Sequence, residues 1–341
     1  MIQKINYLVV VAFFLSACTE GKNDFTGNET NITGIKLDVG CMVGQPSSIT
    51  YLDPLLLFFD RYDNTCVTVF DTKNKQFVRR FVKVGQGPDE VLPPLRLFAS
   101  PIDQKIYMFQ FQAAKLNIYD PGGIIEYDRI TPLQLFFEDR PPEIKKIKDG
   151  YIGSGPFEDG RFRLYDSDGH IVSAFGKYPF HGEDMDRIGR FFIYQGHLAT
   201  SVDGKYFAIG SSYCDNLEFY KIEDGVAILK KKYETYDVKG SFVGNMIQLE
   251  DNCIMNYKAA YGGGYCYMLY SGETLLEKNG QKAGGSKIIV FDWEGNYLKS
   301  YKTNIEILSF CIDEENQIMY AAARDKNDED GGGFNVFQFN L

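Results

Sequence analysis

The sequence is poor in the residues on which many metal and catalytic sites depend. Its 341 residues include only three histidines and one tryptophan, so a histidine-rich metal site is nearly excluded. No two cysteines form a C-x-x-C pair, which leaves zinc and thioredoxin-type sites unsupported. The G-x-S-x-G and H-E-x-x-H motifs of hydrolases and metalloproteases are missing as well. The net charge of -10 argues against nucleic-acid binding, which needs a basic face.

The N-terminus carries an apolar run that is too short to cross a membrane. Residues 7–15 are nine apolar residues, whereas a spanning helix needs about 20. Lys4 precedes this run, and Leu15-Ser16-Ala17-Cys18 follows it. The four residues resemble the lipobox of bacterial lipoproteins. The resemblance implies that residues 1–17 are a signal peptide and that Cys18 is acylated; the alternative is an ordinary secretory signal with an incidental cysteine.

The lipobox-like motif leads to predictions about the segment that follows it and about the location of the protein. Residues 18–34 comprise the lipidated Cys18 and a polar stretch, which we predict to be a flexible tether. The membrane is then a partner through the lipid anchor alone. We expect the bacterial cell envelope, at the outer membrane, and the side of that membrane stays open.

Six cysteines remain beyond Cys18, and a compartment outside the cytoplasm permits disulfides. Cys214 and Cys266 lie in predicted loops and are the better candidates for a disulfide. The others lie in or beside apolar strand-like runs, and we expect most of them to be buried free thiols. They are Cys41, Cys66, Cys253 and Cys311.

From residue 35 onward, the chain shows an all-β pattern with a repeat. Short runs rich in Val, Ile, Phe and Tyr are separated by Gly, Asp and Asn, and helical periodicity is almost absent. Six similar strands recur, and the spacings between their last residues are 49, 46, 55, 71 and 47. Periods of about 40–50 residues with four strands each are typical of propeller blades. The six strands are VTVFD (67–71), LNIYD (116–120), FRLYD (162–166), LEFYK (217–221), IIVFD (288–292) and NVFQF (335–339).

The turns and the chain ends complete the predicted fold. Gly-containing turns at 120–123, 166–169, 222–225 and 292–295 each precede a predicted strand, the first of them at 124–129. The last repeat has only three strands, and an N-terminal strand at 35–43 supplies the fourth. Closure of the ring removes exposed sheet edges. We therefore predict one domain over residues 35–341, a six-bladed β-propeller with four antiparallel strands per blade, whose last blade is closed by the N-terminal strand.

A short motif adds a family resemblance. Val84 begins the segment V-G-Q-G-P-D-E, which ends at Glu90. Together with the lipobox and the repeat, it resembles the TolB-like six-bladed β-propeller lipoproteins of Bacteroidetes, many of which carry G-x-G-P-x-E after the first blade. The resemblance implies a cell-envelope lipoprotein, but it does not imply a catalytic set that can be transferred to this sequence. The segment lacks the G-K-[ST] ending of a phosphate loop, and we predict a structural turn between blades.

Candidate ligand-binding residues follow from propeller geometry. Loops between second and third strands and loops between blades lie on one face, at the mouth of the central channel. Aromatic, arginine and carboxylate side chains on those loops suit a protein, peptide or glycan ligand. Residues 259–286 are expected to form a long tyrosine-rich loop that acts as a lid or a docking arm. The candidates are Arg61, Tyr62, Asp89, Glu90, Phe111, Arg140, Phe157, His181, Arg187, Arg190, Tyr213, Tyr261 and Tyr265.

The expected function is ligand binding by an envelope lipoprotein, with no predicted catalytic residue, metal or other cofactor. The alternative is a hydrolase or lactonase with a divalent metal, such as calcium, in the channel. It would need three or more converging acidic groups, whereas a mixed tyrosine and arginine surface would favour binding. A third hypothesis is a structural scaffold. The acidic residues at 325–330 do not fit the EF-hand spacing, so we interpret them as a solvated hairpin.

Overall fold

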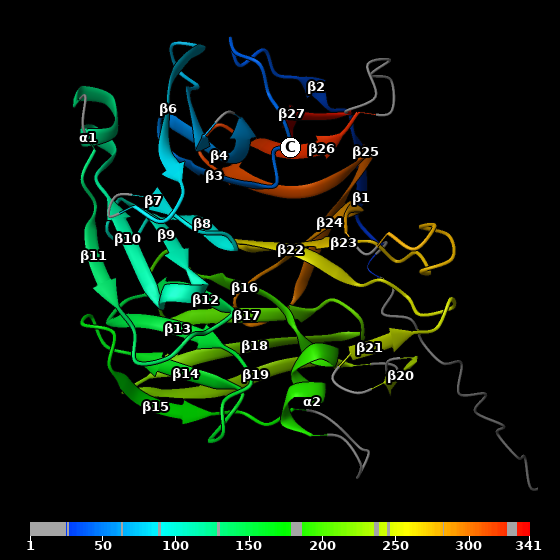
Figure 1. The fold of residues 1–341 in the computed structure, drawn as a ribbon. Helices are drawn as coiled ribbons and strands as arrows, with labels where there is room; N and C mark the ends of the chain where they lie inside the picture. The colour runs from blue at the N-terminus through cyan, green and yellow to red at the C-terminus, as the bar shows by residue number, and fades with distance from the viewer. Residues whose placement is uncertain are drawn as a thin grey trace, which may run out of the picture.

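The computed structural model shows six antiparallel blades arranged in a ring around a central axis (Figure 1). It describes residue 25 and residues 27–62, 64–87, 90–127, 130–178, 186–234, 239–243, 246–281, 283–325 and 333–341. The colour runs around the ring from blue to red, so the first and last blades are neighbours (Figure 1). The predicted all-β, six-bladed propeller is confirmed.

Each blade has four main strands, counted here from the central axis outward. Blade 1 contains β3 (Ser48–Leu52), β4 (Leu55–Tyr62), β5 (Thr65–Asp71) and β6 (Gln76–Val84). Blade 2 contains β8 (Leu95–Ser100), β9 (Lys105–Gln110), β10 (Lys115–Tyr119) and β11 (Leu133–Phe136). Blade 3 contains β12 (Glu143–Ile147), β13 (Gly150–Ser154), β14 (Phe162–Tyr165) and β15 (Ile171–Phe175).

The second half of the ring follows the same plan. Blade 4 contains β16 (Gly196–Thr200), β17 (Tyr206–Ser211), β18 (Asn216–Glu223) and β19 (Val226–Glu234). Blade 5 contains β22 (Tyr257–Gly262), β23 (Cys266–Tyr270), β24 (Gly285–Phe291) and the first half of β25 (Tyr297–Asp313). Blade 6 contains the second half of β25, then β26 (Ile318–Arg324), β27 (Phe334–Asn340) and β2 (Ile35–Lys36).

Smaller elements lie between or beside the blades. They are β1 (Glu29–Ile32), β7 (Glu90–Val91), the 3-10 helix η1 (Phe111–Ala113), α1 (Pro121–Glu126), α2 (Arg187–Tyr194) and the hairpin β20 (Gly240–Val243) and β21 (Met246–Leu249). The hairpin falls between blades 4 and 5, which explains the spacing of 71 residues in the repeat. No helix among the described residues is long and apolar enough to span a membrane.

The six recurring sequence strands correspond to the third strands of the six blades, β5, β10, β14, β18, β24 and β27. A third strand pairs with a strand on each side and packs against the neighbouring blade. Six of the seven residues of β5 are buried, and Leu116 and Ile288 have no exposed surface. The third strands therefore carry the most regular apolar pattern, which is why the repeat is visible in them.

The ring closes through the N-terminal strand, as predicted. Ile35 of β2 pairs with Gln338 of β27, and the Leu37 amide donates to the Val336 carbonyl at 2.9 Å. The paired strand is two residues long, shorter than the predicted span of 35–43. At the axis, each inner strand contacts the next, and β25 contacts β3. β25 has 17 residues and serves two blades, so blades 5 and 6 are joined without a loop.

One predicted strand is a helix. Residues 124–129 follow an Asp-Pro-Gly-Gly turn and were expected to continue as a strand, but residues 124–126 belong to α1. The Asp120 side chain accepts hydrogen bonds from the amides of Gly122 and Gly123, and Pro121 occupies the first turn. This is a helix N-cap followed by a preorganised proline, so the turn chemistry favours a helix. The outer strand β11 comes later, at Leu133–Phe136.

The predicted tyrosine-rich loop over residues 259–286 is also wrong. Most of its tyrosines belong to β22 and β23, and the turn that joins these strands contains Tyr265. That turn links a first strand to a second strand, so it lies at the end of the blade opposite the predicted ligand face. The actual loop between β23 and β24 covers residues 271–284. Gly, Tyr and Met are common to loops and buried strands, so local composition could not separate the two.

The part of the predicted tether that the structure describes packs against blade 5. Residues 29–32 form β1, which runs parallel to β25, and Glu29 pairs with Ser300 in the register. Phe25 is 7% exposed and lies among aromatic rings of blades 4 and 5. The polar composition of this segment gave no sign of a docked strand, because three of the four residues of β1 are exposed and only Ile32 is buried. Cys18 lies outside the described residues.

All six described cysteines are free thiols, which overturns the predicted bridge between Cys214 and Cys266. Both are almost completely buried, and burial raises the pKa of each thiol, which keeps it protonated. Among the four cysteines expected to be buried, Cys41 is only partly so.

Candidate functional site

A cavity of about 300 Å³ occupies the central channel of the ring. All six inner strands line it, namely β3, β8, β12, β16, β22 and the second half of β25. Side-chain hydrogen bonds join neighbouring inner strands here: Thr50 Oγ1 accepts from the Ala99 amide at 2.8 Å, and Ser309 Oγ accepts from the Ile49 amide at 3.3 Å. These bonds hold the channel wall together where no strand ladder connects the blades.

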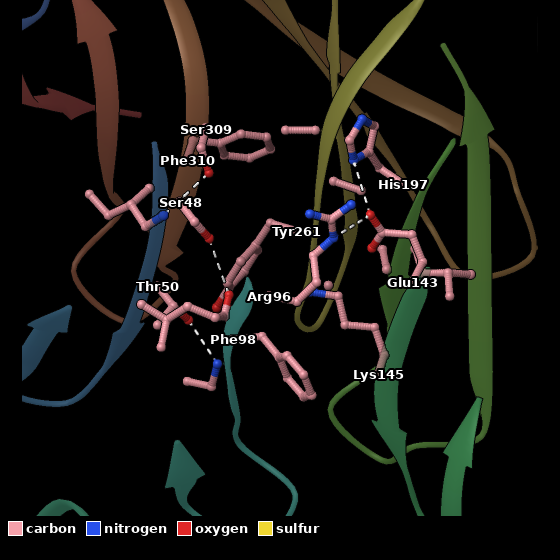
Figure 2. Close-up of a pocket in the computed structure, with 18 of the residues that line it drawn as sticks. Ser48, Thr50, Arg96, Phe98, Glu143, Lys145, His197, Tyr261, Ser309 and Phe310 are labelled. Atoms are coloured by element: carbon pink, nitrogen blue, oxygen red, sulfur yellow. Dashed lines mark hydrogen bonds and ion pairs between the residues drawn. The ribbon is translucent and has the colours of Figure 1, made fainter. Parts of the chain in front are cut away.

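Three side chains from three blades converge on one side of the channel (Figure 2). Arg96 Nε donates to Glu143 Oε1 at 2.9 Å, and His197 Nδ1 lies 4.0 Å from the same carboxylate oxygen. Each residue lies at or near the beginning of its inner strand, where the chain arrives from an interblade connection. The cluster therefore lies toward the face on which ligand binding was predicted.

Two lysines add positive charge to the same cavity. Lys145 follows Glu143 by two residues on β12, and its ammonium lies 4.9 Å from the centre of the Phe98 ring. Burial lowers the pKa of Lys145, and nearby Arg96 lowers it further against the opposing effect of Glu143. Lys258 of β22 is 7% exposed and donates to the Ser212 carbonyl at 3.0 Å.

His197 is held in its neutral form. Burial lowers its pKa to about 4, and the cations Arg96, Lys258 and Lys145 act in the same direction, whereas Glu143 raises it. At neutral pH, the ring can therefore donate one hydrogen bond and accept another. An anion placed in the channel would favour the protonated ring and raise this pKa.

The depressed pKa of His197 predicts an acid-sensitive fold. The folded-state pKa of about 4 lies below the ordinary value of 6.5, so the unfolded chain binds the proton more readily. The stabilisation is complete above about pH 6.5 and is lost as the pH falls through 4. Because 34% of the side chain is exposed, we expect a loss of about 1–2 kcal/mol, less than the full shift would imply.

Urea unfolding of the wild type and of His197→Gln at several pH values between 7 and 4 measures this loss. The glutamine variant should lose about 1–2 kcal/mol less than the wild type over that interval. Parallel losses in the two proteins would contradict a neutral His197.

The lining fits an anion better than a divalent cation. Among the described lining residues, Glu143 is the single carboxylate, and Arg96 already pairs with it. Calcium takes six to eight oxygen ligands, usually with several carboxylates. Arginine and lysine supply the charged hydrogen bonds that carboxylates and phosphates accept. The excess of cations here contrasts with the net charge of -10 for the whole chain.

Among the residues predicted from sequence, Tyr261 lines this channel. It is half-buried on β22 and packs beside Tyr267 and Phe310. Tyr213 lies near the channel wall, where the ammonium of Lys258 is 5.1 Å from its ring centre. The structure thus brings two of the predicted tyrosines near the channel cations.

The other predicted residues are dispersed over the loops. Phe157 is buried beneath the Arg163 guanidinium, 4.5 Å from its ring centre, and Arg187 of α2 forms an ion pair with Glu158 at 3.4 Å. Arg140 is exposed, and Tyr265 is 48% exposed on the opposite face. Of the remainder, Arg190 lies on α2, Phe111 on η1, and Arg61 and Tyr62 end β4, while Asp89 and His181 lie outside the described residues.

Glu90 has a structural role in the G-x-G-P-x-E segment. Its carboxylate accepts a hydrogen bond from the Gly87 amide at 2.8 Å and folds back over the turn. A Cβ on Gly85 would lie 2.0 Å from Glu90 Oε2, and one on Gly87 would lie 3.1 Å away. A side chain at either position would displace the Glu90 carboxylate, so glycine at both positions lets this hydrogen bond form.

Sequence reasoning missed the charged residues of the channel, above all Arg96, Glu143, Lys145, His197 and Lys258. The available signal was the presence of charged residues within the inner strands, including three of the five residues of β12. In a half-buried strand, an isolated charge is ordinarily interpreted as solvent-facing. Because these strands surround the central axis of the ring, the side chains on their channel-facing side point toward one another.

Several solved structures are similar to this chain at low sequence identity. A member of the DUF4221 family from Bacteroides vulgatus is 13% identical with a TM-score of 0.57, and the match covers 91% of this chain and 96% of that one. A gluconolactonase from Xanthomonas campestris is 11% identical with a TM-score of 0.49, over 88% and 87% of the two chains. Hydrazine synthase from Kuenenia stuttgartiensis is 14% identical with a TM-score of 0.47, over 94% and 97%.

These similarities to solved structures concern the fold alone. No curated protein sequence matches this chain significantly. The family model described as TolB-like 6-blade propeller-like matches residues 24–315, which is most of the ring. On this match and on the six observed blades, the chain belongs to the TolB-like six-bladed propeller family.

Proposed function

We propose that this protein is a cell-envelope lipoprotein whose propeller binds a peptide or glycan ligand through a carboxylate group in the central channel. One observation carries the proposal: Arg96, Lys145 and Lys258 line a cavity that contains one described carboxylate, Glu143. With about 300 Å³, the channel admits a chain end or a single sugar unit and excludes a folded domain.

The proposed anchor is consistent with this site. If Cys18 is acylated, six residues lie between it and the docked Phe25, and this stretch reaches at most about 25 Å. The outer edge of blade 5 would then lie near the membrane. The channel mouth belongs to a different surface of the ring and would stay open to ligand.

The lactonase or hydrolase alternative receives less support. A channel metal would need several carboxylates, and the described lining offers Glu143 alone. The gluconolactonase from Xanthomonas campestris resembles this chain at too low an identity to suggest an activity.

Paired ligands that differ only in a carboxylate test the proposal. A short alanine peptide with a free C-terminus is compared with its amide, and D-galacturonic acid is compared with D-galactose, by calorimetry at pH 7. We expect binding of at least one of the acidic ligands and weaker binding of its neutral counterpart. Arg96→Gln should weaken acidic binding by about 10–100-fold, because it removes a charged hydrogen bond.

Two further variants sharpen the test. Arg140→Gln removes an exposed arginine outside the channel and should leave affinity unchanged. Lys145→Met should weaken acidic binding and yet raise the melting temperature of the ligand-free protein, because it removes a partly desolvated cation. Equal binding of acidic and neutral ligands, or equal losses in Arg96→Gln and Arg140→Gln, would contradict the proposal.

A further inference from the structure

A second cavity lies between blades 1 and 2 and shares no lining residue with the channel. We call it the interblade pocket. Its volume is about 430 Å³, within the usual range for small-molecule sites. It lies between the outer strand β6 of blade 1 and the third strand β10 of blade 2. Ile130, Pro132 and Gln134 form another part of its wall.

The charged lining of the interblade pocket is mostly positive. Four cations, Arg79, Arg80, Lys83 and Lys115, face one carboxylate, Glu90. Arg80 already has structural partners: its Nε donates to Thr68 Oγ1 at 3.1 Å, and its guanidinium lies 3.9 Å from the Asp60 carboxylate.

The Glu90 carboxylate already accepts a hydrogen bond from the Gly87 amide in the turn described above. Lys83 is exposed and Lys115 is half-buried. These two lysines are therefore the cations best placed to meet an incoming anion.

Two buried polar groups of this pocket lack a hydrogen-bond partner among the described residues. They are Arg79 Nε and the Oδ1 atom of Asn117. Asn117 is 3% exposed, and its Nδ2 lies 3.4 Å from the Tyr119 hydroxyl. If the amide is turned over, the oxygen meets that hydroxyl and the nitrogen is left over, so one polar atom stays unpaired in either orientation. A buried polar atom without a partner is destabilising, and a hydroxylated ligand would offset this cost.

The backbone beside the pocket is strained. Val82 has a φ of +65°, although a β-branched residue strongly disfavours the left-handed region. It lines the pocket between Phe81 and Lys83. Retained strain of this kind is concentrated at binding and catalytic sites. Charge, unpaired polar atoms and strain therefore coincide in one cavity.

We propose that the interblade pocket binds an acidic sugar unit. Lys83 and Lys115 hold its carboxylate, and the Asn117 amide and Arg79 Nε bind its hydroxyl groups. A hydroxyl group supplies a donor for the Asn117 Oδ1 atom, which a simple anion lacks, and the carboxylate supplies the negative charge that attracts the lysines, which a neutral sugar lacks.

Calorimetry on the chain without its signal peptide tests this site, in the Arg96→Gln background so that the channel contributes little. The ligands are D-galacturonic acid, D-galactose and sodium sulfate. We expect D-galacturonic acid to bind at least 10-fold more tightly than either of the others. Lys83→Gln/Lys115→Gln should weaken it by 10-fold or more, whereas Lys36→Gln, which removes an exposed lysine elsewhere, should not.

A second variant separates recognition from general electrostatics. Asn117→Leu should abolish the preference for D-galacturonic acid over sulfate and leave the melting temperature unchanged or higher, because the unpaired polar group is removed. Equal affinity for sulfate, equal affinity for D-galactose, or no binding of D-galacturonic acid would each overturn the proposal. The channel proposal would survive any of these results, since Arg96 plays no part in the interblade pocket.

Discussion

Replacement of Arg161 by methionine is expected to lower the free energy of unfolding by about 3–5 kcal/mol. The Arg161 side chain has no exposed surface, and its Nη1 donates to a Glu218 carboxylate oxygen at 2.7 Å. Glu218 is itself 3% exposed. Without the guanidinium, its charge would remain inside the protein with no cation beside it, and burial of an unpaired charge is among the most destabilising changes.

Arg161 also joins three parts of the structure. Its guanidinium lies 5.0, 5.5 and 5.8 Å from the ring centres of Phe162, Tyr178 and Tyr194. Its Nη2 donates to the Tyr194 carbonyl at the end of α2, at 3.3 Å. Since Glu218 belongs to β18, one side chain connects blade 3, blade 4 and α2. The methionine variant should therefore lose cation–π contacts along with the ion pair.

Urea unfolding of three proteins measures this contribution. Arg161→Met is compared with Arg161→Met/Glu218→Gln, in which the buried charge is neutralised and about half of the loss should be recovered. The control is Arg187→Met, which breaks an exposed ion pair with Glu158 and should cost less than about 1 kcal/mol. A loss in Arg161→Met no larger than that of the control would contradict the buried-charge explanation.

Phe25→Ala is expected to destabilise the fold by about 3 kcal/mol, even though residue 25 lies near the N-terminus. The Phe25 ring lies 5.4, 5.2 and 5.5 Å from the ring centres of Tyr233, Phe291 and Tyr297. Its carbonyl accepts a hydrogen bond from the buried Ser300 hydroxyl at 3.0 Å. Truncation of the ring would leave a cavity between blades 4 and 5 and weaken the docking of β1.

Thermal unfolding and limited proteolysis together report this docking. Phe25→Ala should lower the melting temperature and speed cleavage near residues 25–32, because release of β1 exposes its backbone. Phe25→Leu keeps much of the buried volume and should show a smaller change in both measurements. If the alanine variant matched the wild type in both, the segment would contribute no stability to blade 5.

The fold was predictable because its signals are local. Turn chemistry and the apolar third strands each occupy a few neighbouring residues. The third-strand pattern recurs six times, and a Gly-containing turn follows four of its copies. Errors arose where one local pattern serves two structures. Asp120 with Pro121 could begin either a hairpin or a helix, and only the capping bonds distinguish them. Tyr261 and its glycine-rich neighbours could be loop or strand, and pairing with β23 decides between these.

The candidate sites were less predictable because they join distant residues. Arg96, Glu143 and His197 are about 50 residues apart in sequence, and they meet because their strands occupy equivalent positions in successive blades. The candidate residues were selected because their loops were predicted to lie on the ligand face of the ring, and most of these loops do lie there. The sequence alone does not show which side chains point into the channel or that positive charges gather there.

The sequence by itself determined the number of blades, the closure of the ring and the place of most turns, since these depend on short-range periodicity and on backbone preferences. It also contains Leu15-Ser16-Ala17-Cys18, whose resemblance to a lipobox and its consequence stay predictions. Only the tertiary structure decided which charges face the channel, that Phe25 is docked, and that the Oδ1 atom of Asn117 is buried without a hydrogen-bond partner among the described residues. The physical reason is that charge, burial and hydrogen bonding at these positions are set by neighbours from other blades.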